Sequence, residues 1–200
     1  MDRSCCIELA AGDKNQLLRI ARQSIDHGFA ERQPIQLDVT TITGSLALDL
    51  GVFVTITQRG ALRGCVGSLE PRHPLAQGVA VAAFNAAFHD RRFPALSRPE
   101  AELVRIEISV LSALESIPMR SNQELLDNLT PHVDGLLIED DDVRATFLPK
   151  VWDKLADPAS FVAQLKEKAG LDTNHWSETI RCYRYQSHTF SEQETGATTG

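Results

Sequence analysis

Residues 52–67, with the sequence VFVTITQRGALRGCVG, decide the kind of fold that this chain adopts. Val52, Val54 and Ile56 recur at every second position, which is the period of a β-strand. Arg59-Gly60 has the composition of a tight hairpin turn. We therefore expect a hairpin of two antiparallel strands, the second of which ends in a bend at Arg63–Gly67.

The rest of the chain mixes helical and strand patterns. Helical periodicity predicts helices near residues 18–29, 75–88, 121–128 and 158–168, the last with Gly170 at its C-terminal end. Alternation predicts strands over 104–110, 133–138, 143–147 and 181–190, and residues 31–49 predict a long connection with one short strand. Strands joined mostly by hairpins, with few helices, indicate an α+β fold with a largely antiparallel sheet.

The segment 75–88 is rich in alanine and apolar on nearly every side. Such a helix is buried, and its small side chains allow another element to approach closely. We expect Ala83 and Ala86 to press on the sheet. The side chains of the strand 104–110 that we expect to face the core are Val104, Ile106, Ile108 and Val110.

The length and composition are those of one globular domain: 200 residues, of which 42% are hydrophobic and 24% charged. We expect this domain over residues 12–192, with flexible termini at 1–11 and 193–200. A net charge of −7 argues against a nucleic-acid-binding protein, since those carry a basic face. The sequence contains neither an apolar run of about 20 residues nor a signal peptide, so we expect a cytoplasmic protein.

The four cysteines, at positions 5, 6, 65 and 182, have the spacing neither of a metal site nor of a disulfide framework. Free thiols fit a reducing cytoplasm. The six histidines are scattered as well, and we expect no metal site. The sequence identifies no cofactor, since it contains no phosphate-binding loop and no dinucleotide fingerprint.

Cys65 lies between Gly64 and Gly67 and follows Arg63 closely. Glycines let a ligand approach backbone N–H groups, and a nearby arginine favours the thiolate form of a cysteine. This arrangement suits a reactive thiol. It equally suits a small apolar residue packed into a tight bend, because free cysteine is among the most buried residue types.

A nucleophilic Cys65 needs a base and a site for an oxyanion. His73, on the loop before the central helix, and His89, at its far end, are the candidate bases. Glu70 is a candidate general acid or base. Glu107 lies on a strand, where the better interpretation is a solvated sheet face.

The cluster His89-Asp90-Arg91-Arg92 follows the central helix. Arginines beside an aspartate can clamp a carboxylate or a phosphate of a ligand. Alternatively, the cluster ends the helix, its cations complement the helix dipole and Asp90 pairs with an arginine. The candidate ligand-binding residues of the chain are Arg63, Gly64, Gly67, Asp90 and Arg92.

These motifs resemble the AMMECR family, whose bacterial and archaeal members are called protein A of the AmmeMemoRadiSam system. The likeness spans residues 12–192. Its mild departures are Val66 in place of the usual isoleucine, and Arg91 and Ala95 where prolines are common. The matching stretches are Leu62–Pro71, Pro74-Leu75, Asp90, Arg92-Phe93-Pro94, Ile106–Ser112, Asp134-Gly135-Leu136, Thr146–Trp152 and Lys168–Trp176.

The resemblance implies an α+β fold of two unequal lobes, with the glycine–cysteine motif near a cleft. It also implies association with a Memo-like protein and a radical SAM protein, and no established reaction. Two hypotheses follow. The first is a cysteine-dependent enzyme whose Arg63 and Arg92 bind a small anionic substrate. The second is a non-catalytic interaction or regulatory module for the Memo-like or radical SAM partner.

Overall fold

The structure, a computed structural model, describes residues 9–38 and 40–192. Within these residues the contacts form two compact units: residues up to 111 together with 188–192, here called the larger unit, and residues 112–187, the smaller unit. Each unit contains a four-stranded antiparallel sheet and helices, so the expected α+β fold is confirmed. Cys5, Cys6 and most of the two termini that we expect to be flexible lie outside the described residues.

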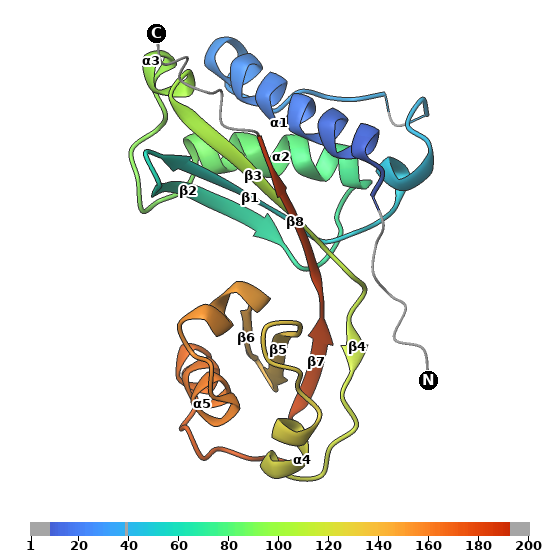
Figure 1. Ribbon diagram of the computed structural model, residues 1–200, viewed down its shortest axis with the longest axis vertical. Coiled ribbons are helices and arrows are strands. Elements are labelled where there is room, and N and C mark those ends of the chain that lie inside the picture. The colour runs from blue at the N-terminus through green and yellow to red at the C-terminus, as the bar shows by residue number, and fades with distance from the viewer. Residues whose placement is uncertain (1–8, 39, 193–200) are drawn as a thin grey trace, which may run out of the picture. The chain divides into compact units, whose positions relative to one another are not determined.

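The sheet of the larger unit contains β1 (Val52–Gln58), β2 (Ala61–Ser68), β3 (Val104–Leu111) and β8 (Ser187–Ser191), in the order β2-β1-β3-β8 (Figure 1). The predicted hairpin is confirmed, with Arg59 and Gly60 at φ 50° and 79°, the left-handed backbone of such turns.

The bend that we expected at Arg63–Gly67 is wrong, because β2 continues through the motif to Ser68. The motif glycines allow close packing rather than a change of direction. A Cβ at Gly64 would lie 2.1 Å from the carbonyl oxygen of Ala86, and a Cβ at Gly67 would lie 2.2 Å from that of Val52. The pairing shifts register between Ile56 and Thr57, and this irregularity places Arg63 outside the regular ladder.

One face of this sheet is covered by α2 (Leu75–Phe88), and α1 (Ala11–Glu31) packs on α2 (Figure 1). This position explains why α2 is apolar all round: Ala83 and Ala86 are buried, as we expected. The predicted core side chains of β3 are buried too, at 6% exposure or less. The connection before β1 contains a 3₁₀ helix, η1 (Gly44–Ala47), in place of the predicted short strand, and α3 (Arg98–Ala101) precedes β3.

The smaller unit has the sheet order β4-β7-β5-β6, made of β4 (Glu115–Ser116), β5 (Gly135–Asp140), β6 (Val143–Phe147) and β7 (Arg181–Tyr185). Its helices are α4 (Asn122–Asp127), η2 (Pro149–Asp153) and α5 (Pro158–Lys168). The core is built around Trp152 and Phe161, whose rings stack with centroids 3.7 Å apart. The single strand predicted over 181–190 is wrong: it is two strands, β7 and β8, that belong to different sheets.

Candidate functional site

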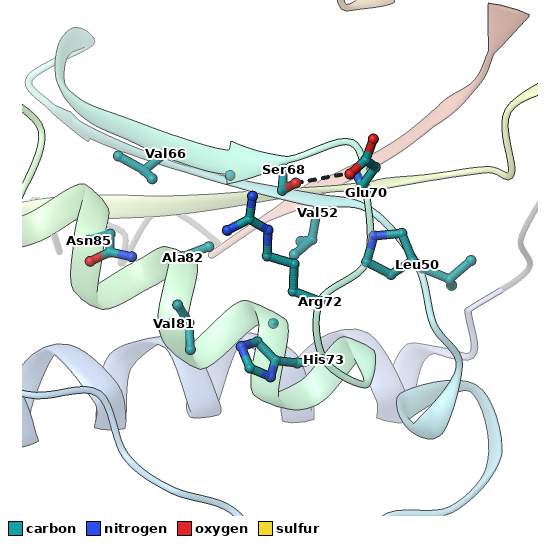
Figure 2. A pocket seen from close by; sticks show the side chains of 13 residues that line it. Leu50, Val52, Val66, Ser68, Glu70, Arg72, His73, Val81, Ala82 and Asn85 are labelled. Atoms are coloured by element: carbon teal, nitrogen blue, oxygen red, sulfur yellow. Dashed lines mark hydrogen bonds between the residues drawn. The ribbon is translucent and has the colours of Figure 1, made fainter. Parts of the chain in front are cut away.

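A pocket of about 350 Å³ opens in the larger unit between α2 and the β1–β2 hairpin, beside the loop 69–74 (Figure 2). We call it the β2–α2 pocket. Its apolar lining residues are Leu50, Val52, Val66, Pro71, Val81 and Ala82, and its polar ones are Ser68, Glu70, Arg72, His73 and Asn85. Gly67 and Gly78 complete the wall. An apolar concave site with a few convergent polar groups is the usual form of a small-molecule site.

The chain builds this pocket from three local features. Alternation along β1 and β2 turns Val52 and Val66 toward α2, while the small residues Gly78 and Ala82 leave space on the helix side. The loop 69–74 closes one end, and it is fastened by the backbone N–H of Glu70, which donates to Ser68 Oγ at 3.2 Å. The pocket walls are therefore set by secondary structure and its polar rim by a loop.

Three of the candidates from the sequence line this pocket, namely Gly67, Glu70 and His73. His73 is exposed and immediately precedes Pro74, the N-cap residue of α2. His89 lies at the other end of α2, and its Nδ1 is 3.0 Å from the side-chain oxygen of Asn85, which lines the pocket. The structure thus brings most of the proposed acid–base residues to one pocket or next to it.

Cys65 does not share this pocket. It pairs with Thr55 across the hairpin, whereas the neighbouring Val66 pairs with Val54. Cys65 therefore lies on the sheet face away from α2, which we call the outer face. The Thr55 hydroxyl donates to Cys65 Sγ at 3.4 Å, and the thiol is partly exposed. In register with them on β3 lies Glu107. A reaction at Cys65 would therefore take place on the opposite side of the sheet from Glu70 and His73.

Asp90 and Arg92 bind the backbone of Cys65. The Cys65 N–H donates to Asp90 Oδ2 at 2.9 Å, and the Arg92 guanidinium donates to the Cys65 carbonyl at 3.2 Å. Since β2 is the edge strand, the two side chains occupy the place of a neighbouring strand and protect the edge. The Arg92 guanidinium, together with the Cys65 N–H, holds the pKa of the Asp90 carboxyl well below its usual range.

Arg63 is also engaged within the protein. Its guanidinium donates to Glu100 Oε1 at 3.1 Å and to the Pro94 carbonyl at 2.8 Å, and only 11% of the side chain is exposed. The hydrogen bond from the Arg63 guanidinium is the main reason why the pKa of Glu100 is lowered to about 2. Three of the candidate ligand-binding residues therefore bind protein groups, namely Arg63, Asp90 and Arg92. Gly64 contacts α2, and Gly67 is the one candidate that lines the pocket.

Sequence reasoning missed Ser68, Arg72 and Asn85 as pocket residues. Arg72 and His73 form a short basic pair between Pro71 and Pro74, and this pair is the signal in the sequence that marks Arg72. Asn85 is the one polar residue in the otherwise apolar run Val79–Phe88, and that isolated amide was the available signal. Ser68 carried no signal apart from its position after the motif.

A second pocket of about 590 Å³ lies beside α1, and its lining includes Asp13, Arg19, Asp38 and Thr41. It contains none of the candidate residues from the sequence. We therefore take the β2–α2 pocket as the candidate site.

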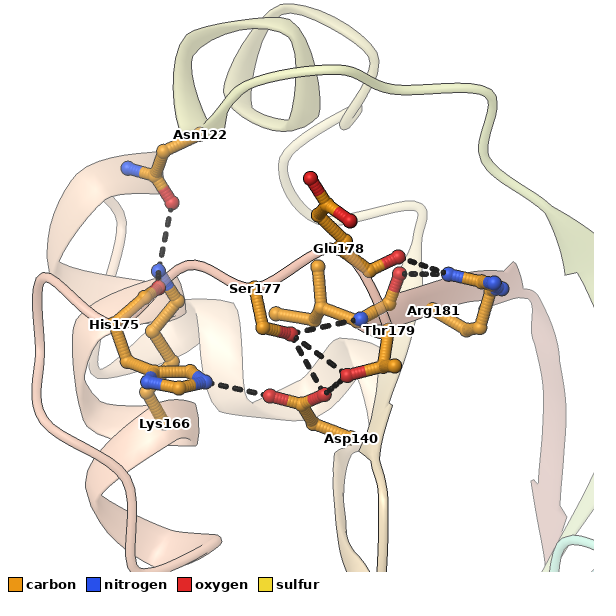
Figure 3. A network of polar contacts seen from close by, with 9 residues as sticks. Asn122, Asp140, Lys166, His175, Ser177, Glu178, Thr179 and Arg181 are labelled. Carbon is orange, nitrogen blue, oxygen red and sulfur yellow. Dashed lines mark hydrogen bonds and ion pairs between the residues drawn. The ribbon is translucent and has the colours of Figure 1, made fainter.

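The smaller unit contains a polar network around two buried side chains, those of Asp140 and Lys166 (Figure 3). Asp140 accepts hydrogen bonds from His175, Ser177 and Thr179, and these bonds, led by that of Thr179, lower its pKa. Beside it, the fully buried Lys166 donates to the Asn122 side chain at 2.9 Å and to the His175 carbonyl at 2.7 Å. Because these buried polar groups have protein partners, we interpret the network as a structural clamp on the segment 172–180.

In the described part of the chain, no three or more His, Cys, Asp or Glu side chains gather as ligands of a metal ion. None of the helices in residues 9–38 and 40–192 has the length and hydrophobicity of a membrane span.

Comparisons with known proteins agree with the fold. A family model described as AMMECR1 matches residues 18–190. The chain is 35% identical over 196 residues to a protein of Thermofilum pendens, with 92% of each chain covered. It is 31% identical over 186 residues to a protein of Methanothermobacter thermautotrophicus, with 92% of this chain and 96% of that one covered. The crystal structure of an uncharacterized protein from Pyrococcus horikoshii superposes with a TM-score of 0.79 at 29% identity, over 88% of this chain and 90% of that one.

Proposed function

The chain belongs to the AMMECR1 family, as its motifs predicted, and from this premise we propose that it binds a small molecule in the β2–α2 pocket. The observation that carries the proposal is the composition of this pocket. An apolar wall from β1, β2 and α2 meets the polar residues Ser68, Glu70, Arg72, His73 and Asn85 at one concave site of about 350 Å³. A site of this size and mixed lining suits a small organic ligand.

The position of Cys65 limits what the bound molecule can undergo. Because the thiol lies on the other face of the sheet, a ligand in the pocket does not meet it. Glu70 and His73 are the acid–base side chains that line the pocket, and Asn85 adds an amide to the lining. The pocket therefore supports ligand binding with acid–base groups at hand, and a cysteine-dependent reaction would need a second binding place on the outer face.

The alternative is an interaction or regulatory module that acts with a Memo-like or a radical SAM protein. For this alternative we place the contact with the partner on the sheet face away from α2, where Cys65, Thr55 and Glu107 lie in register on three strands. Under this proposal the pocket is the sensing site and the partner carries out the chemistry.

The test is capture of a metabolite by the purified protein. The protein is incubated with a heat-cleared cell extract, washed by filtration and denatured, and released compounds are identified by mass spectrometry. The pocket-filling variant is Val81→Phe, because Val81 is half-buried and lines the pocket. Val133→Phe is the matched control, since Val133 is 42% exposed in the smaller unit.

We expect at least one compound that the wild type and Val133→Phe enrich and that Val81→Phe does not. Enrichment that survives Val81→Phe, in a variant with an unchanged circular dichroism spectrum, would place the binding site elsewhere. Repeating the capture with the Memo-like and radical SAM proteins present tests the alternative: a compound enriched only in their presence would favour the module.

A further inference from the structure

We propose that the β2–α2 pocket recognises a compact aliphatic monocarboxylate, whose carboxylate is bound by Arg72 and Asn85, and that His89 is the residue that orients Asn85. The inference rests on the proposed function of the pocket and adds the class of ligand. Three observations carry it: the partners of the arginines near the motif, the contact between Asn85 and His89, and the composition of the rest of the pocket lining.

The first argument concerns the arginines near the motif. Arg63 and Arg92 donate to protein carboxylates and carbonyls. In Figure 2 the Arg72 side chain extends from the loop 69–74 across the pocket, and its guanidinium lies on the β2 side. Arg72 is the one arginine in the lining of the pocket, and we assign it to the ligand anion. A guanidinium matches a carboxylate in geometry and charge.

The second argument concerns Asn85 and His89. An amide oxygen can only accept a hydrogen bond, so the contact of 3.0 Å from Asn85 Oδ1 to His89 Nδ1 requires a proton on that nitrogen. The imidazole is held in turn by Phe84, whose ring it meets edge-on with centroids 5.0 Å apart. With its oxygen held by His89, Asn85 directs its NH₂ group into the pocket, as Figure 2 shows. His89 is thus a positioning residue for a second hydrogen-bond donor.

The third argument concerns the rest of the lining. Ser68 Oγ accepts from the Glu70 N–H, which leaves the hydroxyl hydrogen to donate to a ligand. Arg72 is the one lysine or arginine side chain in the lining of this pocket, so the lining offers one permanent positive charge, which matches a monocarboxylate better than a dianionic phosphate. The lining also contains the aliphatic side chains of Val52, Val66, Val81 and Ala82. One negative charge on a short branched hydrocarbon satisfies all of these surfaces.

The probe for this inference is 4-methylpentanoate, compared with its neutral amide, 4-methylpentanamide, and with inorganic phosphate. Binding is followed by NMR of the methyl groups of Val81 and Ala82 in the full-length protein at pH 7. We expect the carboxylate to shift these signals and to bind about tenfold or more tightly than the amide, since hydrogen bonds to charged groups are the stronger ones. Equal affinity for acid and amide, tighter binding of phosphate, or no shift with the acid would each overturn the inference. Metabolite capture judges the pocket independently of that result.

Variants assign the roles. We expect Arg72→Gln to weaken 4-methylpentanoate binding about tenfold or more, whereas the control Arg91→Gln changes it by less than about twofold, since Arg91 is exposed and outside the pocket lining. His89→Phe, which keeps an aromatic ring against Phe84 but removes the donor, should weaken binding of the neutral amide less than it weakens binding of the carboxylate. His89→Gln, which can still donate to Asn85, should restore the affinity for the carboxylate. Arg72→Gln with unaltered affinity, or His89→Phe and His89→Gln with equal effects, would contradict the assignment.

Discussion

Gly64→Ala tests whether the motif glycines exist for packing. The added Cβ would lie 2.1 Å from the carbonyl oxygen of Ala86, while ordinary contacts of this kind begin near 3.4 Å. The two backbones would have to separate by more than about 1 Å, in an interior that is packed as densely as an organic crystal. Neither group is the end of a flexible side chain, since Gly64 is in the β2 ladder and Ala86 is in α2. The strain therefore has little chance to relax.

We expect a loss of about 2–3 kcal/mol in the free energy of unfolding. Overpacking of a dense interior costs about 1–3 kcal/mol and sometimes more, and the reduced freedom of the unfolded chain returns only about 0.4–1 kcal/mol. For a chain of this size the melting midpoint should fall by about 5–10 °C. Far-UV circular dichroism on heating, with hydrogen exchange of α2 to assign the change to the larger unit, provides the measurement.

Gly78→Ala is the matched control on the same helix. Its Cβ would meet Val52 at 3.4 Å and the His73 carbonyl at 3.9 Å, which are ordinary contacts. Since alanine is the better helix former, we expect this variant to be more stable by about 0.5–1 kcal/mol. If Gly64→Ala were as stable as the wild type, close packing of α2 on β2 would not be the reason for glycine at that position.

Ala83→Leu should destabilise the protein by about 1–3 kcal/mol, because Ala83 is fully buried; an unchanged midpoint in thermal melting would place α2 elsewhere. The pKa of Glu100 is lowered to about 2, so its pairing with Arg63 stabilises the fold above the unfolded pKa near 4.5 and is lost as the pH falls toward 2. Urea titrations should therefore show a stability difference between wild type and Glu100→Gln that is present at pH 6 and shrinks below pH 4; a constant difference would contradict the pairing. Under native conditions iodoacetamide should modify Cys65 faster than Cys182, because burial leaves Cys182 1% exposed and raises its pKa to about 12. Peptide mass spectrometry separates the two sites, and equal rates would refute this order.

Local patterns in the sequence were sufficient where a local cause determines the structure. The Arg59-Gly60 turn follows from two adjacent residues that accept a left-handed backbone. The burial of Val104, Ile106, Ile108 and Val110 follows from alternation on one strand. The break between β7 and β8 has no comparable local signal, because the alternation continues while the strand partners change from one sheet to another.

The glycine–cysteine motif was misjudged for a related reason. Glycine is required both at a bend and where two backbones approach, and one sequence does not distinguish these causes. The pocket could not be predicted from the sequence, because its lining residues are far apart along the chain. Leu50 and Val52 come close to Arg72 and Asn85 only through the way in which α2 lies on the sheet. Residues such as Glu70 and His73 were found since they are close to the motif along the chain.

The alternation of β2 separates the two chemical hypotheses. Val66 and Ser68 turn toward α2 and the pocket, whereas Cys65 turns toward Thr55 on the outer face. A thiol and a pocket that are adjacent in sequence are thus on opposite sides of one sheet. Asp90 fixes this arrangement, because it binds the Cys65 N–H at the strand edge and so resists a rotation of the strand that would exchange the faces. Ligand binding and any reaction of Cys65 must therefore be sought as two activities at two sites.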